Sequence, residues 1–279
     1  MSTVNITAQD INKLRQATGA GMMDCRKALT ESAGDFEAAI DWLRKQGQKV
    51  AAKRSDREAK EGVIIAQTSA DNKTGFVVCI SCETDFVSKN AEFVAFAQSI
   101  ADAAVANNVK SADELNEVMI NGAKVSDMIN DKLASIGEKI GVAKFERVEA
   151  AFVASYIHGA NRMGVLVGLN KEAAEAGRDV AMQIAAMNPL AVDADSIPAD
   201  TIVRERAIII DTMKEDPKMA GKPEEMIAKI AEGKINAFFK EQTLLAQAFV
   251  KDGGKTVGEY VKSVDGALVV TEFKRVALG

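Results

Sequence analysis

The sequence between residues 62 and 80 reads Gly62-Val63-Ile64-Ile65-Ala66, then a polar stretch ending in Asp71-Asn72-Lys73-Thr74-Gly75, then Phe76-Val77-Val78-Cys79-Ile80. Two apolar runs joined by turn-forming residues are typical of a β-hairpin. A loop at Glu83–Asn90 follows. Apolar residues then recur three and four positions apart, as on one face of a helix, at Phe93, Phe96, Ile100 and Ala104. The stretch therefore predicts an antiparallel hairpin with a helix packed on it, which is an α+β arrangement.

The same order of elements occurs again later in the chain. Residues 142–155 are strand-like, Met163–Leu169 is a second apolar strand, and Glu172–Met187 is helical until Pro189 stops it. Helical segments fill the span from the first unit to about Gly141, and Ala267–Val276 alternates as a final strand. The order hairpin, loop, helix near 62–107 and again near 143–187 indicates a duplicated core, although the two copies share few identical residues.

The first 47 residues predict three short helices. Thr7 and Asp10 resemble a capping box, with Asp in place of the usual Glu. The first helix stops at the glycines near residue 20, a second runs over residues 22–32, and a third ends at Gly47. Because so short a segment makes only a thin core, we expect a small satellite bundle. Residues 48–61 are charged, with basic and acidic side chains interleaved. This favours a linker or helix extension over a phosphate-binding patch.

Two helical stretches, 199–216 and 223–233, are separated by Lys214–Pro217 and Gly221–Pro223, which predicts an antiparallel helical hairpin inserted in the second unit. The hairpin either covers a core or forms a contact surface. We expect four parts in the chain. They are the N-terminal bundle with its linker at 1–55, one core subdomain at 56–141, a second at 142–198 with 235–279, and the inserted hairpin at 199–234.

Composition narrows the class of protein. The chain has 279 residues, a net charge of −5 and a pI of about 5.2, so the basic patch of a duplex-binding protein is not evident, and we expect no direct nucleic-acid partner. We find no apolar run of about 18 residues and no signal-like N-terminus, which predicts a protein without a membrane span. Three cysteines do not suggest a disulfide scaffold. These features together predict a cytoplasmic protein.

The search for catalytic chemistry finds little. His158 is the single histidine, and we see neither zinc-ligand spacing nor a phosphate-binding loop of the form G-x-x-x-x-G-K-[ST]. Cys79 and Cys82 satisfy C-x-x-C, but they stand at the end of a predicted strand, where side chains three apart point to opposite faces. We therefore expect one thiol to face the core and the other not. The sequence favours a binding protein with no metal or cofactor over an enzyme. A thiol-dependent enzyme and a structural scaffold stay open as alternatives.

Several apolar residues stand in unusual places. Met22 and Met23 begin a helix and cannot both face the bundle core, so either one is buried and one incidentally exposed, or they form an adaptable contact for a partner. Phe86 lies in a polar loop. It either folds back as a helix-entry staple, with Thr84 or Asp85 as the N-cap, or it projects as a contact residue. A lone histidine such as His158 is more often structural than active.

Five segments together resemble the elongation factor Ts family. They are Thr18-Gly19-Ala20-Gly21-Met22-Met23-Asp24-Cys25-Arg26-Lys27-Ala28-Leu29, Cys82-Glu83-Thr84-Asp85-Phe86-Val87, Ile136-Gly137-Glu138, Tyr156-Ile157-His158-Gly159, and residues 180–189. The resemblance implies a UBA-like N-terminal bundle and a guanine-nucleotide exchange factor that binds the GDP form of elongation factor Tu. It also implies possible self-association through the 199–234 hairpin.

The resemblance carries roles over to particular residues. It implies contacts with the G domain of the partner from the following residues: Thr84, Asp85, Phe86, Val87, His158, Ile136, Gly137, Arg15, Met22 and Met23. It further implies that Phe86 wedges between elements of the G domain, that Asp85 anchors the loop, and that Thr84 holds the start of the helix. The segment Thr84–Val87 would thereby disturb the Mg²⁺ and phosphate contacts of the partner and promote GDP release.

Overall fold

A computed structural model describes residues 5–54, 56–216 and 222–279. The N-terminal bundle consists of α1 (Ala8–Thr18), α2 (Met22–Glu31) and α3 (Phe36–Lys53). The capping box is confirmed, because Thr7 Oγ1 accepts from the backbone N–H of Asp10 while the Asp10 carboxylate accepts from that of Thr7. A small core around Leu14, Cys25 and Leu29 holds the bundle together.

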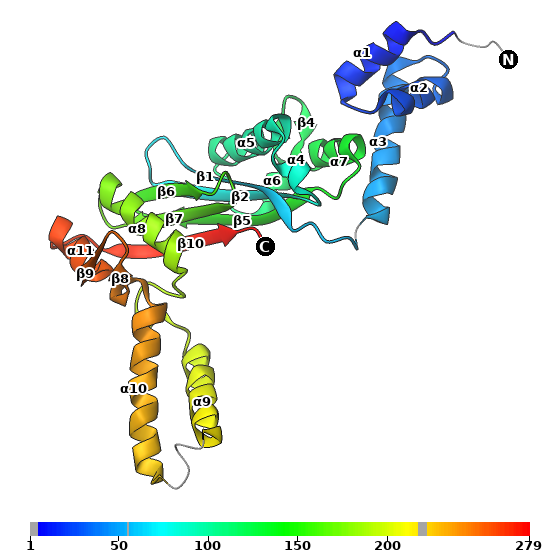
Figure 1. The fold of residues 1–279 in the computed structure, drawn as a ribbon. Coiled ribbons are helices and arrows are strands. Elements are labelled where there is room, and N and C mark those ends of the chain that lie inside the picture. The colour runs from blue at the N-terminus through cyan, green and yellow to red at the C-terminus, as the bar shows by residue number, and fades with distance from the viewer. Residues whose placement is uncertain (1–4, 55, 217–221) are drawn as a thin grey trace.

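The expected end of the third helix at Gly47 is wrong, because α3 continues to Lys53. Gly47 serves a close approach between helices. A Cβ at this position would lie 2.9 Å from Cβ of Ala134, on α7 (Val125–Ile136). The extended α3 packs along α7 and so joins the bundle to the rest of the molecule (Figure 1). Part of the charged stretch is thus a helix extension.

Two three-stranded antiparallel sheets form the centre of the molecule. The first has the order β1 (Glu61–Thr68), β2 (Thr74–Cys82), β5 (Gly141–Glu149), and the second the order β10 (Val270–Ala277), β7 (Met163–Leu169), β6 (Phe152–His158). The expected hairpin is confirmed in register, with Val63 opposite Ile80 and Ile65 opposite Val78. The final strand and the strand at 163–169 are confirmed as β10 and β7.

The strand-like segment expected at 142–155 is instead two strands that belong to different sheets. β5 pairs with β2, whereas β6 pairs with β7. The first sheet therefore extends to Glu149, beyond the boundary at residue 142 that we drew between the subdomains. The four domain boundaries themselves stay a prediction.

The two sheets stack face to face, and helices cover their outer faces, which gives four layers (Figure 1). Alternate side chains of β1 and β2 enter different cores. Ile64 and Val77 face the second sheet, while Val63 and Val78 face the helices. Because both faces of β1, β2 and β7 are buried, these strands read as continuous apolar runs. Gly164 allows the sheets to approach, because a Cβ there would lie 2.8 Å from Cγ2 of Ile64.

Helices cover each outer face. On the first sheet lie α5 (Ala91–Ala106), α6 (Ala112–Glu117) and α7, and on the second lie α8 (Ala174–Met187) and α11 (Val257–Val264). The predicted face of α5 is confirmed, since Phe93, Phe96, Ile100 and Ala104 are all buried. The span to Gly141 is not wholly helical as expected, because β3 (Met119–Ile120) and β4 (Ala123–Lys124) form a two-stranded hairpin within it. A hairpin followed by a helix occurs in both halves, as β1–β2–α5 and β6–β7–α8.

The inserted helical hairpin is formed by α9 (Ala199–Glu215) and α10 (Glu224–Gln242) and projects away from the sheets (Figure 1). The second helix is longer than expected, since α10 continues to Gln242. Part of the predicted connection falls on residues 217–221, outside the described residues. The chain enters the helical hairpin after a 3₁₀ turn (Ala194–Ser196). It returns through a second 3₁₀ turn (Leu244–Ala246) and the two-stranded hairpin of β8 (Ala248–Phe249) and β9 (Asp252–Thr256). Self-association through this hairpin stays a prediction.

Candidate partner-binding site

The connection between β2 and α5 contains one turn of helix, α4 (Asp85–Ser88), where we expected only a loop. On this turn two neighbouring apolar residues have opposite surroundings. Val87 packs against the core between the first sheet and its helices, which we call the first core, whereas Phe86 is 85% exposed. The alternative in which Phe86 folds back as a staple is therefore wrong for this structure. An exposed phenylalanine on a turn that a partly buried neighbour anchors is suited to enter the surface of a partner.

Glu138 holds the start of this turn. Thr84 occupies the N-cap position of α4, but its hydroxyl donates to Glu138 Oε1 at 2.7 Å instead of capping the helix. The backbone N–H groups of Glu83 and Thr84 both donate to Glu138 Oε2 at 3.0 Å. Glu138 follows Gly137, which ends α7 with a positive φ of 78°. The Thr84 side chain therefore does not cap α4 and instead links the start of the turn to Glu138.

Glu83 makes the reciprocal contact. Its Oε1 accepts from the backbone N–H of Lys139 at 2.6 Å and from Arg54 Nη1 at 2.9 Å. Its Oε2 accepts from Arg57 Nη1 at 3.0 Å. The Lys139 N–H and the two guanidinium groups together lower the pKa of Glu83 to about 2. This carboxylate ties the loop to the segment after α7 and to the linker after α3.

The cysteine pair does not form a thiol site. Cys79 faces the core between the sheets and Cys82 faces the core under α5, so the expected opposite orientation is confirmed. The expectation that one thiol would lie outside a core is wrong, because both faces of β2 are covered. Burial raises the pKa of Cys79 to about 11 and that of Cys82 to about 12, which keeps both thiols protonated and unreactive at neutral pH. The Cys82 thiol donates to the Thr84 carbonyl at 3.2 Å.

Asp85 forms an ion pair with Lys89 one turn along the same segment, at 2.6 Å, and the hydrogen bond with Lys89 lowers its pKa. Its anchoring contact is therefore local, and Val87 and Glu138 attach the turn to the core. Arg162, in the turn between β6 and β7, pairs with Glu61 at 2.7 Å. The hydrogen bond and the charge of Glu61 raise the pKa of Arg162. Glu61 begins β1, and β1 also contacts α4.

His158 ends β6 at the same turn and is exposed. Its Nδ1 lies 2.9 Å from the Tyr156 hydroxyl, and the two rings are 5.9 Å apart between centroids. The neighbouring Asn161 exchanges backbone and side-chain hydrogen bonds with Ile64 on β1. The turn that carries His158 is thereby fixed against the edge of the first sheet, while the imidazole stays accessible.

The N-terminal candidates lie on the bundle. Met22 and Met23 are 56% and 75% exposed, so the alternative with one of them buried is wrong, and Arg15 is exposed as well. The turn before Met22 approaches the end of α7, because a Cβ on Gly19 would lie 4.0 Å from Cβ of Ser135. The next residue of α7, Ile136, is 36% exposed. The turn at Gly19 therefore approaches α7 one residue before Ile136, and Glu138 beyond it contacts the Phe86 turn.

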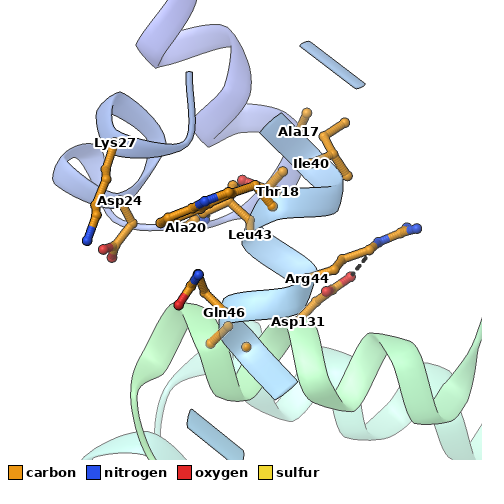
Figure 2. A pocket seen from close by; sticks show the side chains of 13 residues that line it. Ala17, Thr18, Ala20, Asp24, Lys27, Ile40, Leu43, Arg44, Gln46 and Asp131 are labelled. Carbon is orange, nitrogen blue, oxygen red and sulfur yellow. Dashed lines mark hydrogen bonds and ion pairs between the residues drawn. The ribbon is translucent and has the colours of Figure 1, made fainter. Parts of the chain in front are cut away.

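A pocket of about 360 Å³ lies at this junction of the bundle with α7 (Figure 2). Thr18 and Ala20 line it from the bundle, and Asp131 lines it from α7, where its carboxylate is 4.0 Å from Arg44 Nε. The candidates Met22, Met23 and Arg15 are not among its lining residues. The pocket reflects an open seam between two packed elements.

Comparison with known proteins agrees with this geometry. The family model described as "Elongation factor TS" matches residues 83–279, which begin at the start of the Phe86 loop. Proteins named elongation factor Ts from Christiangramia forsetii and Flavobacterium psychrophilum are 50% and 49% identical over 98% of this chain and 99% of their own lengths. The one from Cytophaga hutchinsonii is 46% identical over the full length of both chains. The chain belongs to the elongation factor Ts family.

As a member of the elongation factor Ts family, the chain is a translation elongation factor. Among the described residues, no group of three or more His, Cys, Asp or Glu side chains is placed to hold a metal ion. None of the described helices is long and apolar enough to cross a membrane.

Two residues of this elongation factor Ts site were missed as candidates. Glu83 and Glu138 were quoted within family segments, but we assigned no role to either. Their contacts join segments 54 to 56 positions apart, as between Thr84 and Glu138 or Glu83 and Lys139. Local spacing does not reveal such a contact. The available signal was that each of two family segments contains a glutamate.

Proposed function

We propose that this chain is a guanine-nucleotide exchange factor that binds the GDP form of elongation factor Tu, disturbs its Mg²⁺ and phosphate contacts, and so promotes GDP release during translation. The single observation that supports this most is Phe86, which is 85% exposed on a turn that is held on both sides. Because the backbone of this turn is already held in place, entry of Phe86 into a partner requires little further ordering of the backbone. Binding energy is then available to displace elements of that partner.

The mechanism needs no catalytic group. Elongation factor Tu holds its nucleotide with a phosphate-binding loop and a Mg²⁺ ion that bridges phosphate oxygens. Mg²⁺ requires near-ideal octahedral geometry, so a small displacement of its ligands removes much of the affinity. In our proposal Phe86 supplies the displacement, and Thr84, Asp85 and Val87 keep the turn in place behind it. The buried thiols Cys79 and Cys82 take no part in the reaction.

The remaining candidates form a broader contact surface in this proposal. Ile136 and Gly137 immediately precede Glu138, which binds Thr84 at the start of the Phe86 turn. His158 precedes the turn whose Arg162 pairs with Glu61 on β1. Met22 and Met23 offer flexible apolar side chains that adapt to a partner. We assign binding affinity to these residues and to Arg15, and nucleotide displacement to Phe86.

Linkage sets how the exchange factor is released. If the protein weakens GDP binding by some factor, bound nucleotide weakens binding of the protein by the same factor. GTP that enters the emptied site therefore expels the exchange factor and completes the cycle. The proposal thus predicts that excess GTP or GDP dissociates the complex.

The test is release of a fluorescent GDP from elongation factor Tu, with and without this protein, at saturating Mg²⁺ and again in EDTA. We expect strong acceleration in Mg²⁺ and a smaller gain in EDTA, because the ion that the protein would displace is already gone. An unchanged release rate in Mg²⁺ would overturn the exchange function. An equal gain in both conditions would retain exchange but reject the Mg²⁺ part of the mechanism.

A further inference from the structure

Two segments far apart in the sequence hold each other by their carboxylates. Glu138 accepts three hydrogen bonds from Glu83 and Thr84, and Glu83 accepts the backbone N–H of Lys139. Each glutamate thus binds the backbone next to the other. We call these four residues, Glu83, Thr84, Glu138 and Lys139, the crossed clasp. Hydrogen bonds to a charged acceptor are among the stronger ones in proteins, so the clasp restrains the loop more than neutral contacts would.

The clasp is also charge-balanced. Each carboxylate lies close to the backbone of the other glutamate. The two negative charges would repel each other if neither had a counter-ion. Arg54 and Arg57 both donate to Glu83. The Lys139 ammonium donates to the Arg57 carbonyl at 3.0 Å, which fixes the linker segment that carries Arg57. The linker after α3 is thereby tied to the same point as the loop.

The position of the clasp relates it to Phe86. Thr84 is the residue immediately before α4, and Phe86 is the second residue of that turn. Because the N-cap residue sets the direction in which a helix begins, fixing Thr84 fixes the direction of the whole turn. Val87 alone would anchor one point and leave rotation about it free. The clasp supplies the second point.

We propose that Glu83 and Glu138 are positioning residues, which fix the direction in which Phe86 projects and tie that direction to the linker of the N-terminal bundle. This inference rests on the proposed exchange function for its consequence, but its structural part stands apart from it. Neither glutamate needs to touch the partner. Their effect passes through Thr84 to the turn.

The first experiment measures amide hydrogen exchange of residues 84–88 in the full chain. We expect the fastest exchange in Glu138→Ala and an intermediate rate in Glu138→Gln, because the amide oxygen still accepts from the backbone N–H groups but carries no charge. Glu117→Ala is the matched control, since Glu117 makes an exposed ion pair with Lys124 in the same half of the molecule. Unchanged exchange at 84–88 in Glu138→Ala would overturn the proposal.

Should Glu138→Ala fail to fold, Glu83→Gln takes its place. Glutamine at position 83 still accepts the Lys139 N–H but loses the charge that pairs with both arginines. We expect faster exchange at 84–88 in this variant too, and no change there would count equally against the clasp.

The second experiment is a double-mutant cycle on GDP release from elongation factor Tu. We expect Glu138→Ala to slow release on the order of tenfold, the equivalent of one lost charge-assisted hydrogen bond. In the Phe86→Ala background the same change should slow release no further, because the group that it positions is gone. Additive effects would show that Glu138 acts independently of Phe86 and would overturn the proposal. If the wild-type chain itself fails to accelerate release, the exchange function is wrong, and hydrogen exchange alone decides the clasp.

Discussion

The two hairpin–helix units of the core differ most in the residues that join strand to helix. In the first unit, residues 83–90 connect β2 to α5 and include the α4 turn with its exposed Phe86. In the second unit, residues 170–173 run directly from β7 into α8. Asn170 there exchanges backbone and side-chain hydrogen bonds with Val269, and its side chain also donates to Ala267. Both connections are held firmly, but only the longer one presents a large apolar side chain to solvent.

The comparison separates scaffold from contact surface. Each unit packs a helix on its sheet, and the two sheets pack on each other. Side chains in these cores therefore cannot change size without disturbing the packing. Extra residues in a connection can be added without disturbing that packing, since connections lie on the surface. If this separation holds, substitutions between the sheets will lower stability, and removal of the Phe86 side chain will slow nucleotide release without lowering stability.

The largest effect is expected where the two units meet. Gly164→Val would place side-chain atoms into the space filled by Ile64, Ala66 and Val77 of the opposite sheet. We expect the free energy of unfolding to fall by about 3 kcal/mol, the upper end for overpacking a core. Chemical denaturation measures it. Gly141→Val is the control, because a Cβ on Gly141 meets no atom within 4 Å. Equal stability of the two variants would show that the sheets are not closely stacked.

A smaller effect should separate the two neighbours on the α4 turn. Val87→Ala removes a side chain packed against the first core, and we expect a loss of about 1 kcal/mol in the free energy of unfolding. Phe86→Ala changes an exposed side chain and should stay within about 0.5 kcal/mol of the wild type. Thermal denaturation of both variants tests this. A larger loss from Phe86→Ala than from Val87→Ala would mean that Phe86 folds back onto the core.

Many elements of this fold were predictable from local patterns. The hairpin at 62–80, the buried face of α5, α8 and the inserted helical hairpin all follow from periodicity and turn residues. The four-layer stacking does not. The alternation of side chains along β2 predicts that Cys79 and Cys82 point to opposite faces, but it does not predict that helices cover one face and a sheet covers the other. Gly47 was misread for a similar reason. Its packing against Ala134 overrides the tendency of glycine to end a helix.

The candidate site was predictable only in part. An exposed Phe86 could not be told from a helix staple by local physics, since a phenylalanine near a helix start fits both arrangements. The deciding contacts come from Glu138, which is distant in sequence and reaches Thr84 only after α7 has packed on the first sheet. Resemblance to a family identified the segments, and tertiary structure identified what holds them.

A separate effect concerns acid. The pKa of Glu83 lies at about 2 in the folded protein against an ordinary value of 4.5, so folding favours the ionised carboxylate. Its contribution to stability is complete above pH 4.5, shrinks as pH falls from 4.5 to about 2, and is lost below that. We therefore expect the difference in melting temperature between wild type and Glu83→Gln to be constant from pH 7 to 5 and to shrink below pH 4.5. A difference independent of pH would show that the Glu83 carboxylate is not the group involved.

The central claim is that the exposed side chain of Phe86 drives nucleotide release. The most direct measurement is the rate of fluorescent GDP release from elongation factor Tu with saturating wild-type protein, Phe86→Ala or Met119→Ala, which truncates another exposed apolar residue in the same half. We predict that Phe86→Ala slows release by roughly thirtyfold, as expected for an interface residue worth about 2 kcal/mol, while Met119→Ala matches the wild type. A Phe86→Ala variant that folds normally and releases GDP at the wild-type rate would contradict the account.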